Sequence, residues 1–126
     1  MTWITSARPA TRPAGHVVVT GDRSIAVDSE GYLLHLDDWS PAFASALAAR
    51  EGLVLTDAHW EVIEFLRSHW QGHGVQAQVR VMVRHFSDRW GVERGSNHAL
   101  HAMFPVGGPQ KQGNRLAGLL RTKGEH

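Results

Sequence analysis

The sequence predicts an α+β fold, mainly α, in which a small N-terminal β-hairpin or meander packs on an array of about five helices. Three observations predict this class. Short β-favouring runs lie before residue 37, apolar residues recur at helical spacing from residue 41 onward, and glycine or proline separates the helical segments. The chain has 126 residues and 42% apolar composition, which suits one domain with a buried core.

The first elements are expected to be strands. Residues 17–20 and 24–27 favour strands, and the pair Gly21-Asp22 between them suits a tight hairpin turn. A third strand is expected over residues 32–36, after a turn at 29–31. The apolar period then changes to that of a helix.

Two helices are expected next, each with a recognisable start. Ser40 caps the first, with proline in its first turn, and this helix runs to about residue 50 before Gly52. Thr56 caps the second, which runs until Gly72 and Gly74.

Three further helices complete the array. The third is expected over residues 76–90, with Gly91 after it, and the fourth begins at Ser96 and ends before Pro105. The fifth follows Gly107 and reaches about residue 117.

The domain organisation follows from these elements. Residues 1–15 are expected to be a disordered extension, residues 16–118 a single domain, and residues 119–126 a flexible arm, because neither end shows periodicity. No apolar run is long enough to cross a bilayer, and the first fifteen residues lack the apolar stretch of a secretory signal. We therefore expect a cytoplasmic protein.

Composition excludes several chemistries. The chain contains no cysteine, which excludes disulfides, thiolate zinc sites and a cysteine nucleophile. The net charge is only +1, but residues 1–27 carry +2, residues 28–66 carry −7 and residues 67–126 carry +6. Such sorting favours association with charged partners more than it stabilises the fold.

Nine histidines raise the question of a metal site. His69 and His73, like His98 and His101, are spaced so that they can share a helix face. No HExxH motif or other compact ligand set accompanies them. We therefore expect structural or surface histidines, with no metal and no cofactor.

Two other patterns admit a binding interpretation. Gly107, Gly108 and Lys111 at a helix start are able to hold an anion, although a plain loop-to-helix cap is favoured. The second and third helices resemble a helix-turn-helix, from which Arg80 and Arg84 would reach nucleic acid or another anion. The second of these helices lacks the polar side chains that usually read bases.

Several motifs occur in order from about residue 17 to the end. They are Asp28-Ser-Glu-Gly-Tyr-Leu, Asp37-Asp-Trp39, Leu55-Thr-Asp-Ala-His-Trp60, Glu61-Val-Ile-Glu-Phe-Leu66, Val79-Arg-Val-Met-Val83, Phe104-Pro-Val-Gly-Gly-Pro109, Lys111-Gln112 and Leu116-Ala-Gly-Leu119. Together these motifs resemble the DsrC/TusE/DsvC family of sulfur-relay proteins, which includes the gamma subunit of dissimilatory sulfite reductase. The resemblance implies a β-hairpin or meander on about five helices, with a flexible C-terminal arm. It thus agrees with the fold predicted from the residues.

The resemblance also implies where the chemistry of the family lies. A penultimate cysteine on the arm accepts and passes sulfur, and some members carry a second cysteine eleven positions earlier. These positions hold Glu125 and Asn114 in this chain. Neither side chain can form a persulfide or a disulfide. We therefore expect no catalytic residue at either position.

These observations lead to one expected function and two alternatives. We expect a cysteine-less member that is not an enzyme, and that regulates or competes in the sulfite reductase or sulfur-relay system by binding a thiol-bearing paralogue or TusBCD- and DsrEFH-like donors. The alternatives are a DNA-binding transcriptional regulator acting through residues 57–90, and a sulfurtransferase component of sulfur relay, including tRNA 2-thiolation. The residues expected to contact the partner are Lys111, Arg115, Arg121, Lys123 and Glu125.

Overall fold

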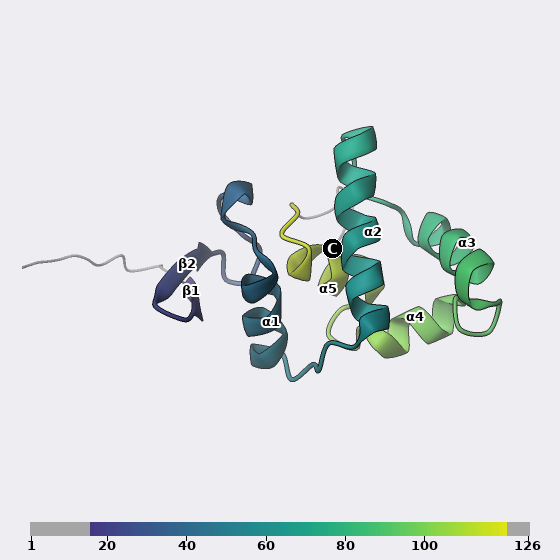
Figure 1. Ribbon diagram of the computed structural model, residues 1–126, viewed down its shortest axis with the longest axis horizontal. Coiled ribbons are helices and arrows are strands. Elements are labelled where there is room, and N and C mark those ends of the chain that lie inside the picture. Colours follow the sequence, from purple (N-terminus) through teal and green to yellow (C-terminus); the bar gives the residue numbers. More distant parts are fainter. Residues whose placement is uncertain (1–15, 121–126) are drawn as a thin grey trace, which may run out of the picture.

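A computed structural model describes residues 16–120 and confirms the predicted class, a hairpin followed by five helices. The hairpin lies at one end of the molecule, and α3 and α4 lie at the other (Figure 1). The elements are β1 (His16–Thr20), β2 (Arg23–Val27), the 3-10 helix η1 (Leu36–Asp38), α1 (Pro41–Arg50), α2 (Asp57–His73), α3 (Val79–Trp90), α4 (Asn97–Met103) and α5 (Gly108–Leu116).

The hairpin has the predicted turn and one buried face. Its strands are antiparallel, with Val18 opposite Ile25, and both of these side chains are buried. Gly21 has a φ of 62°, which the tight turn requires and which glycine adopts without strain. The guanidinium of Arg50 in α1 donates a hydrogen bond to the carbonyl of Val17 at 2.6 Å and so ties the hairpin to the helices.

The predicted third strand over residues 32–36 is wrong. Only one isolated bridge forms there, between Val27 and Leu33. The carbonyls of His35 and Leu36 accept hydrogen bonds from the N–H groups of residues 38 and 39, at 3.0 and 3.3 Å. The chain therefore turns into η1 before a ladder can extend.

Helices α1 and α2 begin where their caps predict. The Ser40 hydroxyl accepts from the Phe43 N–H, and Thr56 exchanges hydrogen bonds with His59 in a capping box. His59 is only 7% exposed, and its Nε2 lies 2.8 Å from the carbonyl of Met103. Because Nδ1 accepts from the Thr56 N–H, Nε2 carries the hydrogen and donates to α4.

Helix α3 begins three residues later than predicted. Gln78 is the N-cap in extended conformation, and residues 76 and 77 lie in the linker from α2. The linker is held by longer-range bonds, since the Gln110 side chain donates to the Ala77 carbonyl at 3.0 Å. Such contacts outweigh the local helical pattern.

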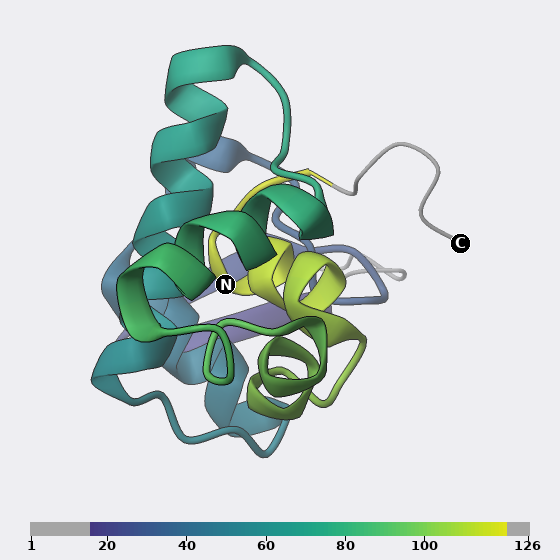
Figure 2. The same cartoon turned by 90° about the vertical axis from the view of Figure 1, so that its right-hand side faces the viewer.

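Helix α5 is the centre of the fold. Seven of its nine residues are buried, and it contacts α1, α2 and α4. Figure 2 shows it in the middle of the molecule. Gly113 allows close packing against α2, because a β-carbon there would lie 2.8 Å from Leu66 Cδ1 and would force that side chain to shift. No helix within residues 16–120 is long and apolar enough to span a membrane.

Candidate functional site at the C-terminal end of the last helix

The position at which the resemblance implies a second cysteine is sealed in the core. Asn114 lies in α5 and is 0% exposed. Neither its Nδ2 nor its Oδ1 has a hydrogen-bond partner. An unpaired buried polar group costs about 1–3 kcal/mol. This amide therefore destabilises the core, and no partner can reach it in this conformation.

The end of α5 is fixed by two side chains from earlier elements. The Trp39 Nε1–H donates to the Leu116 carbonyl at 2.7 Å, and the Arg67 guanidinium donates to the Ala117 carbonyl at 2.8 Å. The same guanidinium carbon lies 3.8 Å from the centroid of the Trp39 ring, a cation–π contact. Partial burial lowers the pKa of Arg67 below its ordinary value. These contacts fix the backbone of residues 116 and 117 against the body.

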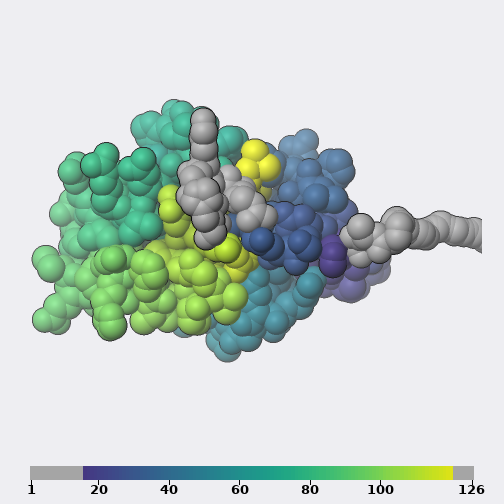
Figure 3. Space-filling model, turned by 180° about the vertical axis from the view of Figure 1, so that it is seen from behind, coloured from purple at the N-terminus to yellow at the C-terminus, as the bar shows by residue number. Residues whose placement is uncertain are grey.

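The first two residues of the predicted arm belong to the body. Leu119 is 3% exposed in the core, and the Gln76 side chain donates to the Leu120 carbonyl at 2.9 Å. Figure 3 shows the last described residues, in yellow, reaching the surface between teal and blue segments. A cavity of about 230 Å³ lies beside them. Its lining residues are Leu36, Asp37, Arg67, Trp70, Gln71, Gly118 and Leu119.

Arg115 is not available to a partner, which corrects its expected role. It is 3% exposed, and its Nε lies 3.0 Å from Glu51 Oε2. Its Nη2 also donates to the Val106 carbonyl at 2.6 Å. Burial alone lowers the pKa of Arg115, but the hydrogen bond and charge of Glu51 outweigh burial and raise this pKa. Arg115 is a core residue that sequence reasoning mistook for a surface cation.

Gln112 completes this polar network, and no local pattern signalled it. Its Nε2 donates to Glu51 Oε1 at 2.8 Å, and its Oε1 accepts from the Val106 N–H at 3.0 Å. Glu51 lies 61 residues before Gln112 in the chain. The network joins the end of α1, the loop before α5 and α5 itself.

Lys111 lies at the edge of the same region. Its Nζ is 3.9 Å from Glu30 Oε1, and both side chains line a cavity of about 340 Å³ that also holds Glu51. The Gly108 N–H donates to the Phe104 carbonyl, and residue 109 is proline, so the start of α5 has few free amides. Two carboxylates and occupied donors do not favour the anion site considered for Gly107, Gly108 and Lys111.

The two arginines of α3 that were predicted to contact nucleic acid lie at the surface. Arg80 and Arg84 are exposed one turn apart on α3, and the Arg80 Nε donates to Gln78 Oε1 at 3.1 Å. Contact of these residues with nucleic acid stays a prediction.

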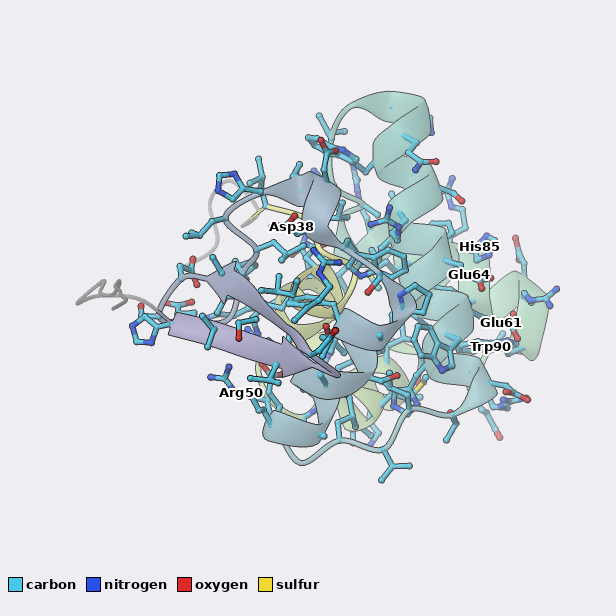
Figure 4. All side chains as sticks on the ribbon, turned by 60° about the vertical axis from the view of Figure 1, so that its left-hand side comes forward. Asp38, Arg50, Glu61, Glu64, His85 and Trp90 are labelled. Atoms are coloured by element: carbon cyan, nitrogen blue, oxygen red, sulfur yellow. The ribbon has the colours of Figure 1, made fainter. Side chains whose placement is uncertain are left out.

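A shallow groove of about 400 Å³ runs between α2 and α3. Figure 4 shows Glu61, Glu64 and His85 gathered there, away from Asp38 and Arg50. Glu61 pairs with Arg89, whose hydrogen bond is the main cause that lowers the Glu61 pKa. The pair therefore neutralises one of the cations of α3.

The remaining predicted residues Arg121, Lys123 and Glu125 lie outside the described residues. Within residues 16–120, no group of three or more histidine, aspartate or glutamate side chains is placed to hold a metal ion.

Comparison with known proteins identifies the architecture. The model of the family described as DsrC like protein matches residues 19–124. The chain belongs to this family. It is 42% identical over 95 residues to the sulfurtransferase TusE of Sodalis glossinidius, and the matched segment covers 75% of this chain and 87% of that protein. It is 40% identical over 97 residues to the sulfurtransferase TusE of Pectobacterium atrosepticum, and the matched segment covers 77% of this chain and 88% of that protein.

Solved structures of DsrC show the same fold. The NMR structure of Allochromatium vinosum DsrC has a TM-score of 0.77 and 36% identity, covering 87% of this chain and 97% of that one. The crystal structure of the oxidized gamma-subunit of the dissimilatory sulfite reductase from Archaeoglobus fulgidus has a TM-score of 0.77 and 28% identity. The match covers 86% of this chain and 98% of that one. The predicted membership and fold are thus confirmed.

One functional expectation needs correction. The sequence was expected to encode a non-enzyme, yet DsrC-like relatives at about 40% identity are named sulfurtransferases. The chain therefore belongs to a sulfur-transfer family, and it has no cysteine.

Proposed function

We propose that this chain is a sulfur-relay component that docks on the partners of its thiol-bearing relatives, while a cysteine of the partner carries the sulfur atom. The observation that carries this proposal is the combination of a DsrC-like body with no sulfhydryl group at all. Persulfide chemistry needs a thiolate, which carboxylates and amides do not replace.

The end of α5 supports docking. Trp39, Arg67 and Gln76 hold residues 116–120, which directly precede the last six residues of the chain, on the body. Those six residues carry Arg121 and Lys123 against Glu125. Together with Lys111, they form the proposed contact with an acidic surface of the partner.

The partner class follows from the relatives. The Archaeoglobus relative is a subunit of dissimilatory sulfite reductase, and the TusE relatives are sulfurtransferases. We therefore propose a sulfite reductase subunit or a sulfur-relay donor as the partner of this chain. Occupying the site of a thiol-bearing paralogue would make the chain a regulator or competitor of transfer. A transfer assay with and without this chain distinguishes a competitor from a component that promotes transfer.

Retention of purified partners on the immobilised chain tests docking. The truncated control ends at Leu120, because this cut leaves the buried helix α5 intact. The full chain is expected to retain a sulfite reductase subunit or a TusBCD-like donor, and the truncated chain to retain much less. Failure of the full chain to retain any of them would contradict the proposal.

DNA binding through residues 57–90 is the second candidate, since Arg80 and Arg84 are exposed one turn apart on α3. Replacing both arginines with alanine is expected to weaken DNA binding and to flatten its salt dependence. A mobility-shift titration at low salt that shows no complex with the unaltered chain would exclude this candidate.

A further inference from the structure

The last turns of α2 carry two histidines on the same face. His69 and His73 are four residues apart, and their ring centroids lie 4.3 Å apart, with 36° between the ring planes. Side chains at this spacing stand above one another on a helix. Two histidines with this spacing on a helix bind zinc in the HExxH motif. At this spacing, as in that motif, side-chain rotation would allow one nitrogen of each ring to face a shared cation.

The surroundings suit ligand histidines. His73 is exposed, and His69 is half-buried with Phe65 beside it, at 5.9 Å between ring centroids. Partial burial and, second, the nearby His73 lower the pKa of His69. Neutral imidazole binds a cation through the lone pair of a ring nitrogen. Both rings are also near the C-terminal end of α2, where the helix dipole favours positive charge.

We propose that His69 and His73 form a chelating site for a borderline transition-metal cation of the Zn²⁺, Cu²⁺ or Ni²⁺ class. Imidazole is a preferred ligand for these cations. Within the described residues no third ligand side chain joins the pair, so water completes the coordination. This site is independent of the proposed docking function.

A bound cation is expected to stabilise the end of α2. Metal ligation cross-links the last two turns of α2, which lead through Gly74 to Gln76. The Gln76 side chain holds the Leu120 carbonyl. Since the cation binds the folded helix better than the unfolded chain, it is expected to raise the melting temperature.

The chain offers a matched control in α4. His98 and His101 are three residues apart, and Nδ1 of His101 lies 2.9 Å from the Asn97 carbonyl, to which it donates. The His101 ring also packs against Gly108, where a β-carbon would lie 3.0 Å from it. This pair is therefore not expected to chelate.

The experiment uses the full chain without an affinity tag. Calorimetric titration with ZnCl₂ is expected to show one cation per chain, and electron paramagnetic resonance of the Cu²⁺ complex is expected to show two coordinating nitrogens. His69→Ala or His73→Ala should each lower the affinity on the order of 100-fold, because each removes one arm of the chelate. Circular dichroism checks that the variants keep their helices.

The control variant replaces both His98 and His101 with alanine, and it should bind like the unaltered chain. Binding that survives His69→Ala and His73→Ala would overturn the proposal by placing the cation elsewhere, as would the absence of binding at millimolar Zn²⁺. Loss of binding in the control variant together with unchanged binding in the His69 and His73 variants would assign the cation to α4 instead.

Discussion

Arg115 and Glu51 form a two-point ion pair inside the molecule, with Nε 3.0 Å from Oε2 and Nη2 3.2 Å from Oε1. The two side chains are 4% and 13% exposed. Glu51 is the C-cap residue of α1, so the pair joins the end of that helix to α5. Arg115, although it lies in a basic C-terminal segment, thus stabilises the packing of the core.

Arg115→Ala is expected to lower the free energy of unfolding by about 3 kcal/mol, because it removes a buried cation and leaves the largely buried Glu51 carboxylate without its charge partner. Urea denaturation followed by circular dichroism measures this change. Lys111→Ala is the control, since the Lys111–Glu30 pair is partly exposed and 3.9 Å apart. Its loss should be no more than about 1 kcal/mol. Equal losses for the two variants would contradict the structural role of Arg115.

Asn114→Cys is expected to stabilise the protein by about 1–3 kcal/mol, because it replaces two unpaired buried polar atoms with a weakly polar group of similar size. Thermal and urea denaturation provide the measurement. Gln112→Met in the same helix is the matched comparison. Gln112 is equally buried, but both of its amide atoms are bonded. Its replacement should therefore destabilise, and the same sign for both variants would refute this explanation.

Trp39→Phe is expected to loosen the end of α5 with little change elsewhere. The variant removes the donor to the Leu116 carbonyl and weakens the cation–π contact with Arg67. The expected loss of stability is about 0.5–1.5 kcal/mol for the hydrogen bond. Hydrogen exchange should accelerate at the Leu119 N–H, which donates to the Asn114 carbonyl. Unchanged exchange at Leu119 would show that Trp39 does not hold this segment.

Glu125→Cys is expected to restore acceptance of sulfur from a relay donor, because it returns a thiol to the position that the resemblance assigns to the reactive cysteine. Intact-mass spectrometry after incubation with a persulfide donor would show the added sulfur. Asn114→Cys serves as control, since position 114 is sealed in the core and its thiol should stay unmodified. Sulfur found covalently on the unaltered chain would contradict the proposed function.

Much of the fold could be predicted because its signals are local. Ser40 and Thr56 stand at helix starts and bond to N–H groups three residues later, and Gly21 stands in a two-residue turn. Each of these depends on residues a few positions apart. Family membership was also predictable, because the motifs occur in order along the chain.

The errors lie where distant residues compete with local pattern. Residues 32–36 have strand-like composition, but they form only an isolated bridge with β2 and no ladder. The linker before α3 is held by hydrogen bonds to Gln110 and Leu120. Charge patterning also could not tell a buried cation from a surface one, because the carboxylate that neutralises Arg115 lies 64 residues earlier.

The order of residues alone was enough to establish the helices, the family and the loss of both thiols, since these depend on side-chain identity and short-range hydrogen bonding. Only the packed structure decided that Arg115 is internal, that Asn114 is unpaired, and that Leu119 and Leu120 belong to the body. Burial and long-range pairing arise when α5 is enclosed by α1, α2 and α4, and no local pattern records that event.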